Sequence, residues 1–392
     1  MRKLCTVVFV VLLAGCVQVP KEINVNLNGI GGSDDSEGTS SGTSSLGIPS
    51  SSGGGWKETA AAVAGQVFLA SEHGVLFYAF DTLAYPGQPV DLAARAQAVK
   101  NMKGIKGLTV SFVEGDEPVA VATTDGNGLA KVSWTPPKEG DYKLKAVITG
   151  RPEGVSEDVL KVSPSPLLVA ARDKESEFVV IDLDHTVVDS SFFHVLLGNP
   201  TPMAGSVDVA KRISESYSII YLTHRPDLLA RKSKDWLARH KYPDGPLLVS
   251  ELRDAFGDSG KFKTAKLKAV KKSYGNVKIG IGDKLSDAQA YVDNGLIAYL
   301  IPHYKEKPDD MQKMAGSIRK LDGRGRLNVV DGWREIEMGV FKGRKYNPSA
   351  YAGRLDRRAK QLAREQRRRR EKERDRDDDD DDDEDEDDED DD

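Results

Sequence analysis

The segment 178–190, FVVIDLDHTVVDS, constrains the fold of this chain more than any other stretch of its sequence. Four apolar residues that favour β-structure end on Asp182, and a second aspartate follows at Asp184. A short run of this kind is typical of a strand buried on both faces, as in a parallel sheet. A carboxylate is costly to bury without a partner. The two aspartates therefore indicate a compensating partner, or a chemical function, at the end of a buried strand.

Strand-like and helix-like segments alternate between residues 178 and 302. The apolar β-forming runs lie at 178–181, 218–222, 247–249, 277–281 and 297–301, and the helical patterns lie near 207–216, 226–240, 261–274 and 286–294. This alternation predicts an α/β domain with a doubly wound parallel sheet. Ligands of such domains bind at the carboxyl ends of the strands, which is where the two aspartates lie.

Further reactive side chains lie near the ends of these predicted elements, namely Thr223, Lys263, Asp283 and Asp287. Clustered carboxylates raise one another's pKa unless a hard cation lies among them, and Mg²⁺ suits carboxylates combined with a phosphate oxygen. A hydroxyl and an ammonium group can hold the other phosphate oxygens. The combination predicts phosphoryl transfer with Mg²⁺ as the cofactor.

The motifs resemble a known family when they are taken in order. DxDxT after a strand, a strand ending in threonine, a helix-borne lysine and GDxxxD resemble the four motifs of the haloacid dehalogenase superfamily. Within that superfamily, YLTHRP, PDGPLLVSELR, FKTAKL and GIGDKLSDAQAYVDNG resemble the catalytic domain of lipin-type phosphatidate phosphatases. The resemblance covers about a third of the chain and implies a phosphatase domain with a small cap or none.

The resemblance implies a role for each site residue. Asp182 would be the nucleophile that forms an aspartyl-phosphate, and Asp184 would be the general acid and then the general base. Thr223 and Lys263 would bind the transferring phosphoryl group. The implied metal-binding residues are Asp182, Asp184 (through its carbonyl), Asp283 and Asp287, the last as a ligand or an orienting group.

Two points stay open from the sequence. Lys261 and Lys266 flank Lys263, and either could take the phosphate-binding role instead. His185 stands where many relatives have glycine, and His224 stands where they have a small residue. These histidines could contact a substrate head group or could simply fill local space.

The first residues, MRKLCTVVFVVLLAGC, have a basic start and an apolar core too short to span a membrane. LAGC resembles the lipobox of bacterial lipoproteins, which implies a signal peptide at 1–15, cleavage before Cys16 and lipidation of that cysteine. An ordinary signal peptide with a chance cysteine is the alternative. A Gly/Ser-rich tether would follow at 16–55. The expected location is the bacterial cell envelope, with the chain lipid-anchored to a membrane on its periplasmic or surface face.

Two other regions flank the predicted catalytic domain, which is expected at 174–345. Residues 70–165 carry short alternating runs separated by turns such as Asp125-Gly126-Asn127-Gly128, which predict a β-sandwich. TTDGNGLAKVSWTPPKEGDYKLKA resembles bacterial immunoglobulin-like surface domains. The sandwich is interpreted as a spacer or packing module, with ligand binding as the alternative.

Charge is concentrated at the carboxyl end of the chain. The formal net charge is −6, but the run 377–392 is entirely acidic and the preceding stretch 354–376 is strongly basic. The rest of the chain is nearly neutral, so nucleic acid is not an expected partner. Residues 346–392 are therefore predicted to form a basic helix followed by a disordered acidic tail. The basic part could attract anionic lipid.

The sequence as a whole predicts a Mg²⁺-dependent phosphatase. The interval between Asp182 and Thr223 is too short for a large cap, and an open site suits a bulky substrate. The expected substrate is phosphatidate or a related phospholipid phosphate. The alternatives are a phosphatase of small soluble or nucleotide phosphates and a catalytically silent surface interaction lipoprotein.

Overall fold

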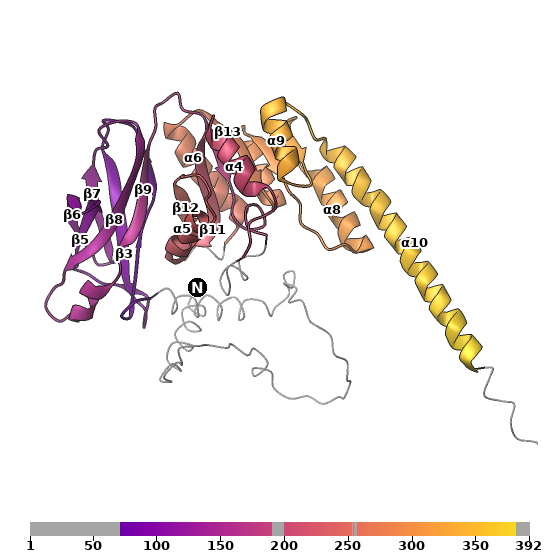
Figure 1. The fold of residues 1–392 in the computed structure, drawn as a ribbon, viewed down its shortest axis with the longest axis horizontal. Helices are drawn as coiled ribbons and strands as arrows, with labels where there is room; N and C mark the ends of the chain where they lie inside the picture. Colours follow the sequence, from indigo (N-terminus) through magenta and orange to yellow (C-terminus); the bar gives the residue numbers. More distant parts are fainter. Residues whose placement is uncertain (1–70, 190–199, 253, 255–256, 382–392) are drawn as a thin grey trace, which may run out of the picture.

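The computed structural model describes residues 71–189, 200–252, 254 and 257–381 of the chain. The predicted signal peptide, Cys16 and the tether lie outside these residues, as does the end of the acidic run. The described part contains a β-sandwich, an α/β domain beside it and a long terminal helix (Figure 1). The predicted fold class, a parallel α/β domain preceded by a β-sandwich, is confirmed.

Six parallel strands form the sheet of the α/β domain in the order β12-β11-β10-β13-β14-β15. Their bounds are Phe178–Ile181 (β10), Ser218–Pro226 (β11), Leu247–Ser250 (β12), Val277–Gly282 (β13), Ile297–Leu300 (β14) and Leu327–Val329 (β15). The sequence predicts the first five. It does not reveal β15, because three residues are too few to show a period.

Helices cover both faces of this sheet, as a doubly wound fold requires. One face carries the core packed by α4 (Ser206–Ser214), α5 (Ala230–Arg239) and α9 (Trp333–Lys342), with the short helix η3 (Asp227–Leu229) leading into α5. The other face carries the core packed by α6 (Ser259–Ser273), α7 (Leu285–Asp293), α8 (Pro308–Lys320) and α10 (Pro348–Asp381). Among the described residues between β10 and β11, α4 is the one helix, which fits the expected small cap or none.

The sandwich has its own apolar core between two sheets. One sheet contains β1 (Val75–Ala79), β3 (Val90–Ala98), β4 (Lys103–Gly104) and β7 (Leu129–Trp134). The other contains β2 (Thr82–Ala84), β5 (Thr109–Glu114), β6 (Glu117–Thr123), β8 (Gly140–Gly150) and β9 (Ser165–Ala171), and the short helix η2 (Glu157–Lys161) precedes β9. Strand β9 carries the sandwich beyond the boundary expected at residue 165.

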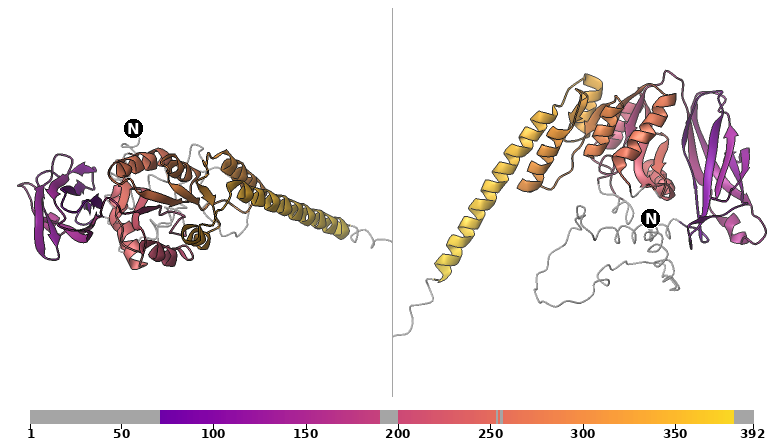
Figure 2. Two further views of the ribbon diagram at one scale, coloured as in Figure 1. Left: turned by 90° about the horizontal axis from the view of Figure 1, so that it is seen from above. Right: turned by 180° about the vertical axis from the view of Figure 1, so that it is seen from behind.

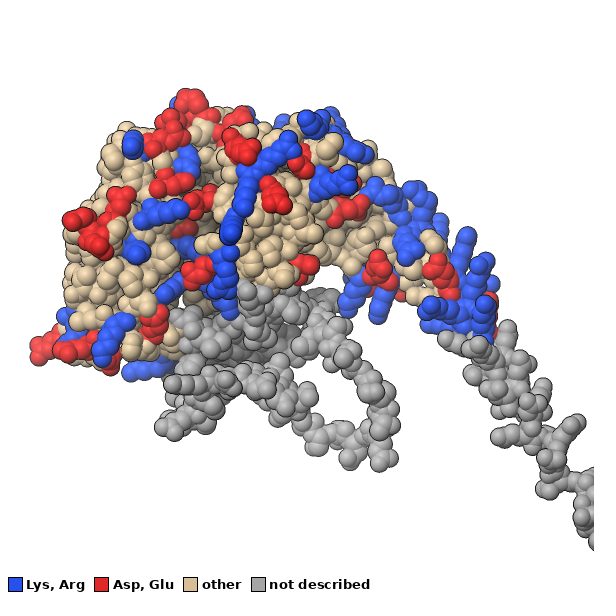
Figure 3. All heavy atoms as spheres, viewed as in Figure 1, with Lys and Arg blue, Asp and Glu red and all other residues tan. Residues whose placement is uncertain are grey.

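Helix α10 packs against α8 along its first part and then extends away from the domain (Figures 1 and 2). Its buried residues include Tyr351, Leu355 and Ala359, which follow one another at intervals of one turn. Basic side chains crowd its outer part (Figure 3). The helix continues into the acidic run as far as Asp381, which was expected to be disordered, because adding residues to an existing helix costs little. Within the described residues, no helix is both long and apolar enough to cross a membrane.

Candidate active site

Strand β10 places its two aspartates at the carboxyl edge of the sheet. Its four residues are fully buried between β11 and β13, and the backbone N–H of Asp182 still donates to the carbonyl of Ile281 (3.0 Å). The side chain of Asp182 therefore emerges where the sheet ends. Only 4% of it is exposed, so the carboxylate is held in a region that strengthens any interaction with a charged neighbour.

Helix α6 supplies a lysine from a position that would ordinarily be apolar. Asp258 caps the helix by accepting a hydrogen bond from the backbone N–H of Lys261 (3.0 Å). The buried residues of the helix are Lys263 and Leu267, which are one turn apart and therefore on one face. Lys261 and Lys266 are exposed. Of the three lysines, the structure thus brings only Lys263 into the site.

Helix α7 lies close against β13 because the strand carries glycines there. A Cβ atom at Gly280 would lie 2.3 Å from the ring of Tyr291, so no larger residue fits without a shift. The hydroxyl of Tyr291 donates to the carbonyl of Ile281 (3.3 Å). This close packing brings Asp287, in the first turn of α7, next to Asp283 at the end of β13.

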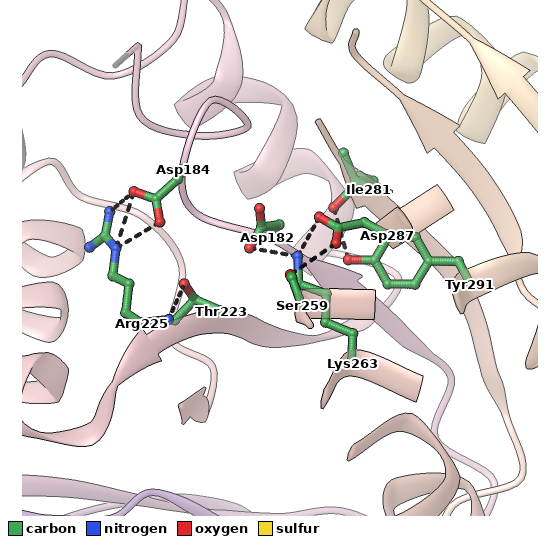
Figure 4. Close-up of polar contacts among 9 residues, drawn as sticks. All are labelled: Asp182, Asp184, Thr223, Arg225, Ser259, Lys263, Ile281, Asp287 and Tyr291. Atoms are coloured by element: carbon green, nitrogen blue, oxygen red, sulfur yellow. Dashed lines mark hydrogen bonds and ion pairs between the residues drawn. The ribbon is translucent and has the colours of Figure 1, made fainter. Parts of the chain in front are cut away.

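These elements converge on one cluster. Asp182, Asp283 and Asp287 are all buried, and each offers a carboxylate oxygen within 4.8 Å of the others. Lys263 Nζ lies 2.9 Å from Asp182 Oδ1 and 2.5 Å from Asp287 Oδ2, so one ammonium joins two of the three carboxylates (Figure 4). The predicted site residues from three separate segments of the chain are therefore neighbours in space.

The charges of this cluster perturb one another. Burial raises the pKa of Asp283 well above its usual range, and the nearby carboxylates of Asp182 and Asp287 raise it further. Burial also raises the pKa of Asp182, although Lys263 opposes this change. For Lys263, burial favours the neutral form, but the carboxylates of Asp182 and Asp287 outweigh it and hold the pKa well above the usual range. The site is thus deficient in positive charge around Asp283.

The residues fit a divalent cation. Asp283 Oδ1 is buried and has no hydrogen-bond partner in the described part of the chain. An unpaired buried carboxylate oxygen is costly, and hard cations such as Mg²⁺ are bound by oxygen ligands. The cluster of Asp182, Asp283 and Asp287 could therefore bind a metal ion. The side-chain oxygens of Asp184 are not part of this cluster.

Asp184 instead pairs with an arginine that the sequence analysis did not single out. Arg225 binds both carboxylate oxygens of Asp184 through Nε (3.2 and 3.1 Å) and one of them through Nη2 (2.7 Å). Its remaining Nη1 donates to Ser233 Oγ (2.8 Å). The carboxylate of Asp184 therefore points toward Arg225, away from Asp182 (Figure 4). The position of Arg225 just after Thr223, in THRP, was the signal that could have revealed it.

The remaining predicted residues lie around the cluster. Thr223 is fully buried, and its Oγ1 accepts a hydrogen bond from the backbone N–H of Arg225 (3.3 Å). His185 has a left-handed backbone (φ 52°), a conformation that glycine adopts more readily than other residues, and its carbonyl is 2.7 Å from His303 Nε2. His224 Nε2 is 3.0 Å from the carbonyl of Asp254. The ring of His224 thus contacts a backbone carbonyl, whereas the ring of His185 lies against the ring of His303, with centroids 4.6 Å apart.

The fold and the cluster define a doubly wound α/β domain with a carboxylate site that could hold a metal ion. Residues 179–301 match the family model described as "PITM 1-3, LNS2 domain". This part of the chain is therefore similar to the LNS2 domain and has a lipin-like phosphatase fold.

Curated relatives match part of the chain. Human membrane-associated phosphatidylinositol transfer protein 2 is 31% identical over 125 residues, which are 30% of this chain and 8% of that protein. Protein retinal degeneration B of Drosophila melanogaster is 28% identical over 184 residues, 45% of this chain and 13% of that protein. The chain thus spans only a small part of these relatives.

Likenesses to solved structures are weaker. The Pnkp1/Rnl/Hen1 RNA repair complex matches 36% of this chain and 51% of its own, with 16% identity and a TM-score of 0.30. The Lin-41 filamin domain matches 24% of this chain and 91% of its own, with 17% identity and a TM-score of 0.15. Both TM-scores are too low to support a conclusion about function.

We expect Asp283→Asn to stabilise the metal-free protein and to weaken its response to Mg²⁺. A buried carboxyl whose pKa is raised on folding contributes stability that is fully present below its unfolded pKa and is lost as the pH rises from there through its folded pKa. Replacing Asp283 should therefore raise the free energy of unfolding near neutral pH by about 1–3 kcal/mol in chelator. Urea unfolding with chelator and with Mg²⁺ measures both effects.

The exposed Asp116, in the turn between β5 and β6, provides the control. Asp116→Asn should leave both the stability and the response to Mg²⁺ unchanged. If Asp283→Asn lowered the free energy of unfolding in chelator, the carboxylate of Asp283 would have to be stabilised by its surroundings. The interpretation of the cluster as short of positive charge would then be wrong.

Proposed function

We propose that this protein is a Mg²⁺-dependent phosphatase that forms an aspartyl-phosphate on Asp182, with phosphatidate or a related phospholipid phosphate as its substrate. One observation carries the proposal. A buried lysine and three buried carboxylates, one with an unpaired oxygen, meet at the carboxyl edge of a parallel sheet. Such an arrangement is suited to a dianionic group that arrives together with a cation.

In the first step, an oxygen of the Asp182 carboxylate attacks the phosphorus atom, and the bond from phosphorus to the alcohol oxygen breaks. The alcohol leaves with a proton from the carboxyl group of Asp184, which would first leave its pair with Arg225 and turn toward the leaving oxygen. In the second step, water attacks the phosphorus of the aspartyl-phosphate while Asp184 takes one of its protons. Inorganic phosphate leaves, and Asp182 is regenerated. Splitting one displacement into two in this way is covalent catalysis.

The other residues hold the reacting groups in place and neutralise their charge. Lys263 Nζ, 2.9 Å from Asp182 Oδ1, is placed to hold a phosphoryl oxygen beside the nucleophile. Thr223 lies at the end of the neighbouring strand and can offer its hydroxyl to another oxygen. Arg225 holds the carboxylate of Asp184 beside the site, turned away from Asp182, through its fork of N–H groups. Mg²⁺ held by Asp182, Asp283 and Asp287 would neutralise charge on the phosphoryl group when bound.

A lipid substrate is supported by the relatives and by the site. One of the two relatives is named for membrane association and for phosphatidylinositol transfer, and the LNS2 domain has a lipin-like phosphatase fold. Only α4 lies between β10 and β11 within the described residues, so no large cap is seen over the site. A site of this kind leaves room for a bulky substrate.

Two further parts of the chain would bring the site to a membrane. Lipidation of Cys16 would anchor the chain in the bacterial cell envelope, because several acyl chains on one residue bind a bilayer firmly. The exposed basic side chains of α10 would add attraction to anionic lipid, worth about 1 kcal/mol for each residue near the surface.

The function is tested by phosphate release from the full chain. We expect phosphatidate in mixed micelles to be hydrolysed in Mg²⁺ much faster than an aryl phosphate, and we expect chelator to stop both reactions. Release from the aryl phosphate alone would keep the phosphatase and remove the lipid substrate. If neither compound released phosphate, the catalytically silent alternative would replace the proposal.

A further inference from the structure

The sandwich and the α/β domain share a buried interface. Side chains of the sandwich, including Leu76 and Tyr78, form one apolar cluster with Leu228 and Leu229, which lie just after β11. The sandwich packs on the side of the α/β domain that carries α5 and β12 (Figure 1). An interface of this kind is more than a spacer needs, since a spacer has only to separate the two domains.

One buried carboxylate of the α/β domain is bound largely by the sandwich. The side chain of Asp227 is only 1% exposed. Arg95 Nη1 donates to its Oδ2 (2.9 Å), and the hydroxyl of Tyr78 lies 3.2 Å from the same oxygen. Both partners come from strands of the sandwich, β1 and β3. The third contact, from the backbone N–H of Leu228 (3.0 Å), is local.

Asp227 is the last residue of a short segment, 223–227, that contains two residues of the candidate active site. Within residues 223–227, Thr223 and Arg225 contribute to the site, and Arg225 holds Asp184. Strand pairing fixes this segment at one residue only. Strand β11 pairs with β10 as far as Tyr221 and with β12 as far as Leu222. Its pairing with β12 resumes only at Pro226. Side-chain contacts must therefore hold the segment in place.

We propose that the sandwich positions this segment, and that Asp227 is the positioning residue through which Arg95 and Tyr78 do so. The sandwich would then be part of the catalytic unit. The effect of this contact on turnover rests on the proposed function. Its effect on how rigidly residues 223–227 are held does not. Because a misplacement of about 1 Å can slow a reaction about 10²-fold, loss of this contact should be visible in kcat.

A second buried ion pair across the same interface provides a matched control. Asp81 of the sandwich has a side chain only 2% exposed, and Lys234 Nζ of α5 lies 2.8 Å from its Oδ1. The backbone N–H groups of Leu168 and Leu247 also bind Asp81. Asp81 would keep these two donors after Lys234 is removed, and Asp227 would keep the N–H of Leu228 together with the Tyr78 hydroxyl, which it shares with Gln97 Oε1 (2.9 Å). Lys234 also donates to the carbonyls of Ala79 (3.1 Å) and Pro166 (2.7 Å), and it lies on α5, outside the segment 223–227.

The experiment compares Arg95→Met with Lys234→Met in the full chain. Both variants should lose stability. In Arg95→Met we expect amide hydrogen exchange of residues 219–229 to accelerate by about tenfold. We expect its kcat for phosphatidate and for an aryl phosphate to fall by about 10-fold to 10²-fold with little change in KM, below the melting range of both variants. Lys234→Met should change neither quantity.

The conservative variant Arg95→Lys, which keeps the charge, should recover part of the loss. If Arg95→Met and Lys234→Met had equal effects on amide hydrogen exchange and on kcat, Asp227 would be an interface contact with no special role in positioning. That result would overturn the inference. If the wild type hydrolysed neither phosphate, the proposed function would fail. The exchange comparison would still decide whether the sandwich holds residues 223–227.

Discussion

Replacing Asp182 with asparagine should abolish phosphate release while leaving the chain folded. The two side chains have nearly the same shape, but an amide oxygen is too weak a nucleophile to form the acyl phosphate. We expect kcat to fall by at least about 10³-fold, with no return at higher substrate concentration. Fold integrity is checked by unfolding in urea, since Lys263 keeps its second partner, Asp287.

A trapped intermediate makes the test specific to the nucleophile. Wild-type protein quenched during turnover should carry labelled phosphate that hydroxylamine removes, and Asp182→Asn should carry none. Asp189→Asn is the matched control, because Asp189 lies in the same segment and is exposed. A variant of Asp182 that kept the wild-type rate would remove it as the nucleophile. The proposed aspartyl-phosphate would be removed with it.

Much of the catalytic domain could be predicted from the sequence because local patterns determine it. The buried run before Asp182 is fully apolar and appears as β10 with the predicted bounds. Asp182, Asp283 and Asp287 meet because the carboxyl ends of parallel strands lie at one edge of a sheet. The choice of Lys263 over Lys261 and Lys266 needed the structure, since the sequence does not fix which face of α6 is buried.

The contacts that the sequence did not reveal are long-range. Arg225 binds Asp184, 41 positions earlier in the chain, and Arg95 binds Asp227, 132 positions later. An arginine in a polar motif resembles any solvated arginine until its partner is known. For the same reason the sandwich was interpreted as a spacer. Its buried pairs with the α/β domain join residues that no local pattern connects.

The second large effect is expected from Lys263→Met, which should be the most destabilising of the substitutions considered. Methionine has a similar length, so the change removes the charge with little loss of packing. Asp182 and Asp287 would then be buried without the ammonium that joins them. Removing one partner of a buried ion pair costs about 3–5 kcal/mol. We expect a loss of this size in the free energy of unfolding by urea with chelator present.

The pH dependence of this loss identifies its cause. Burial already raises the pKa of Asp182, and Lys263 is the main group that opposes this change. Without Lys263 the folded pKa of Asp182 should rise further, and a carboxyl with a raised pKa favours the folded state only at low pH. The deficit of Lys263→Met should therefore be largest at and above neutral pH and should shrink as the pH is lowered. A deficit independent of pH would indicate lost packing instead.

Two further variants complete the comparison. Lys266→Met changes an exposed lysine of the same helix and should alter the stability by no more than about 0.5 kcal/mol. Adding Asp287→Asn to Lys263→Met removes one uncompensated carboxylate and should restore part of the loss. Mg²⁺ should also reduce the deficit, because a cation among the carboxylates offsets the missing ammonium. If Mg²⁺ had no effect, the carboxylate cluster would not be the site where the ion binds.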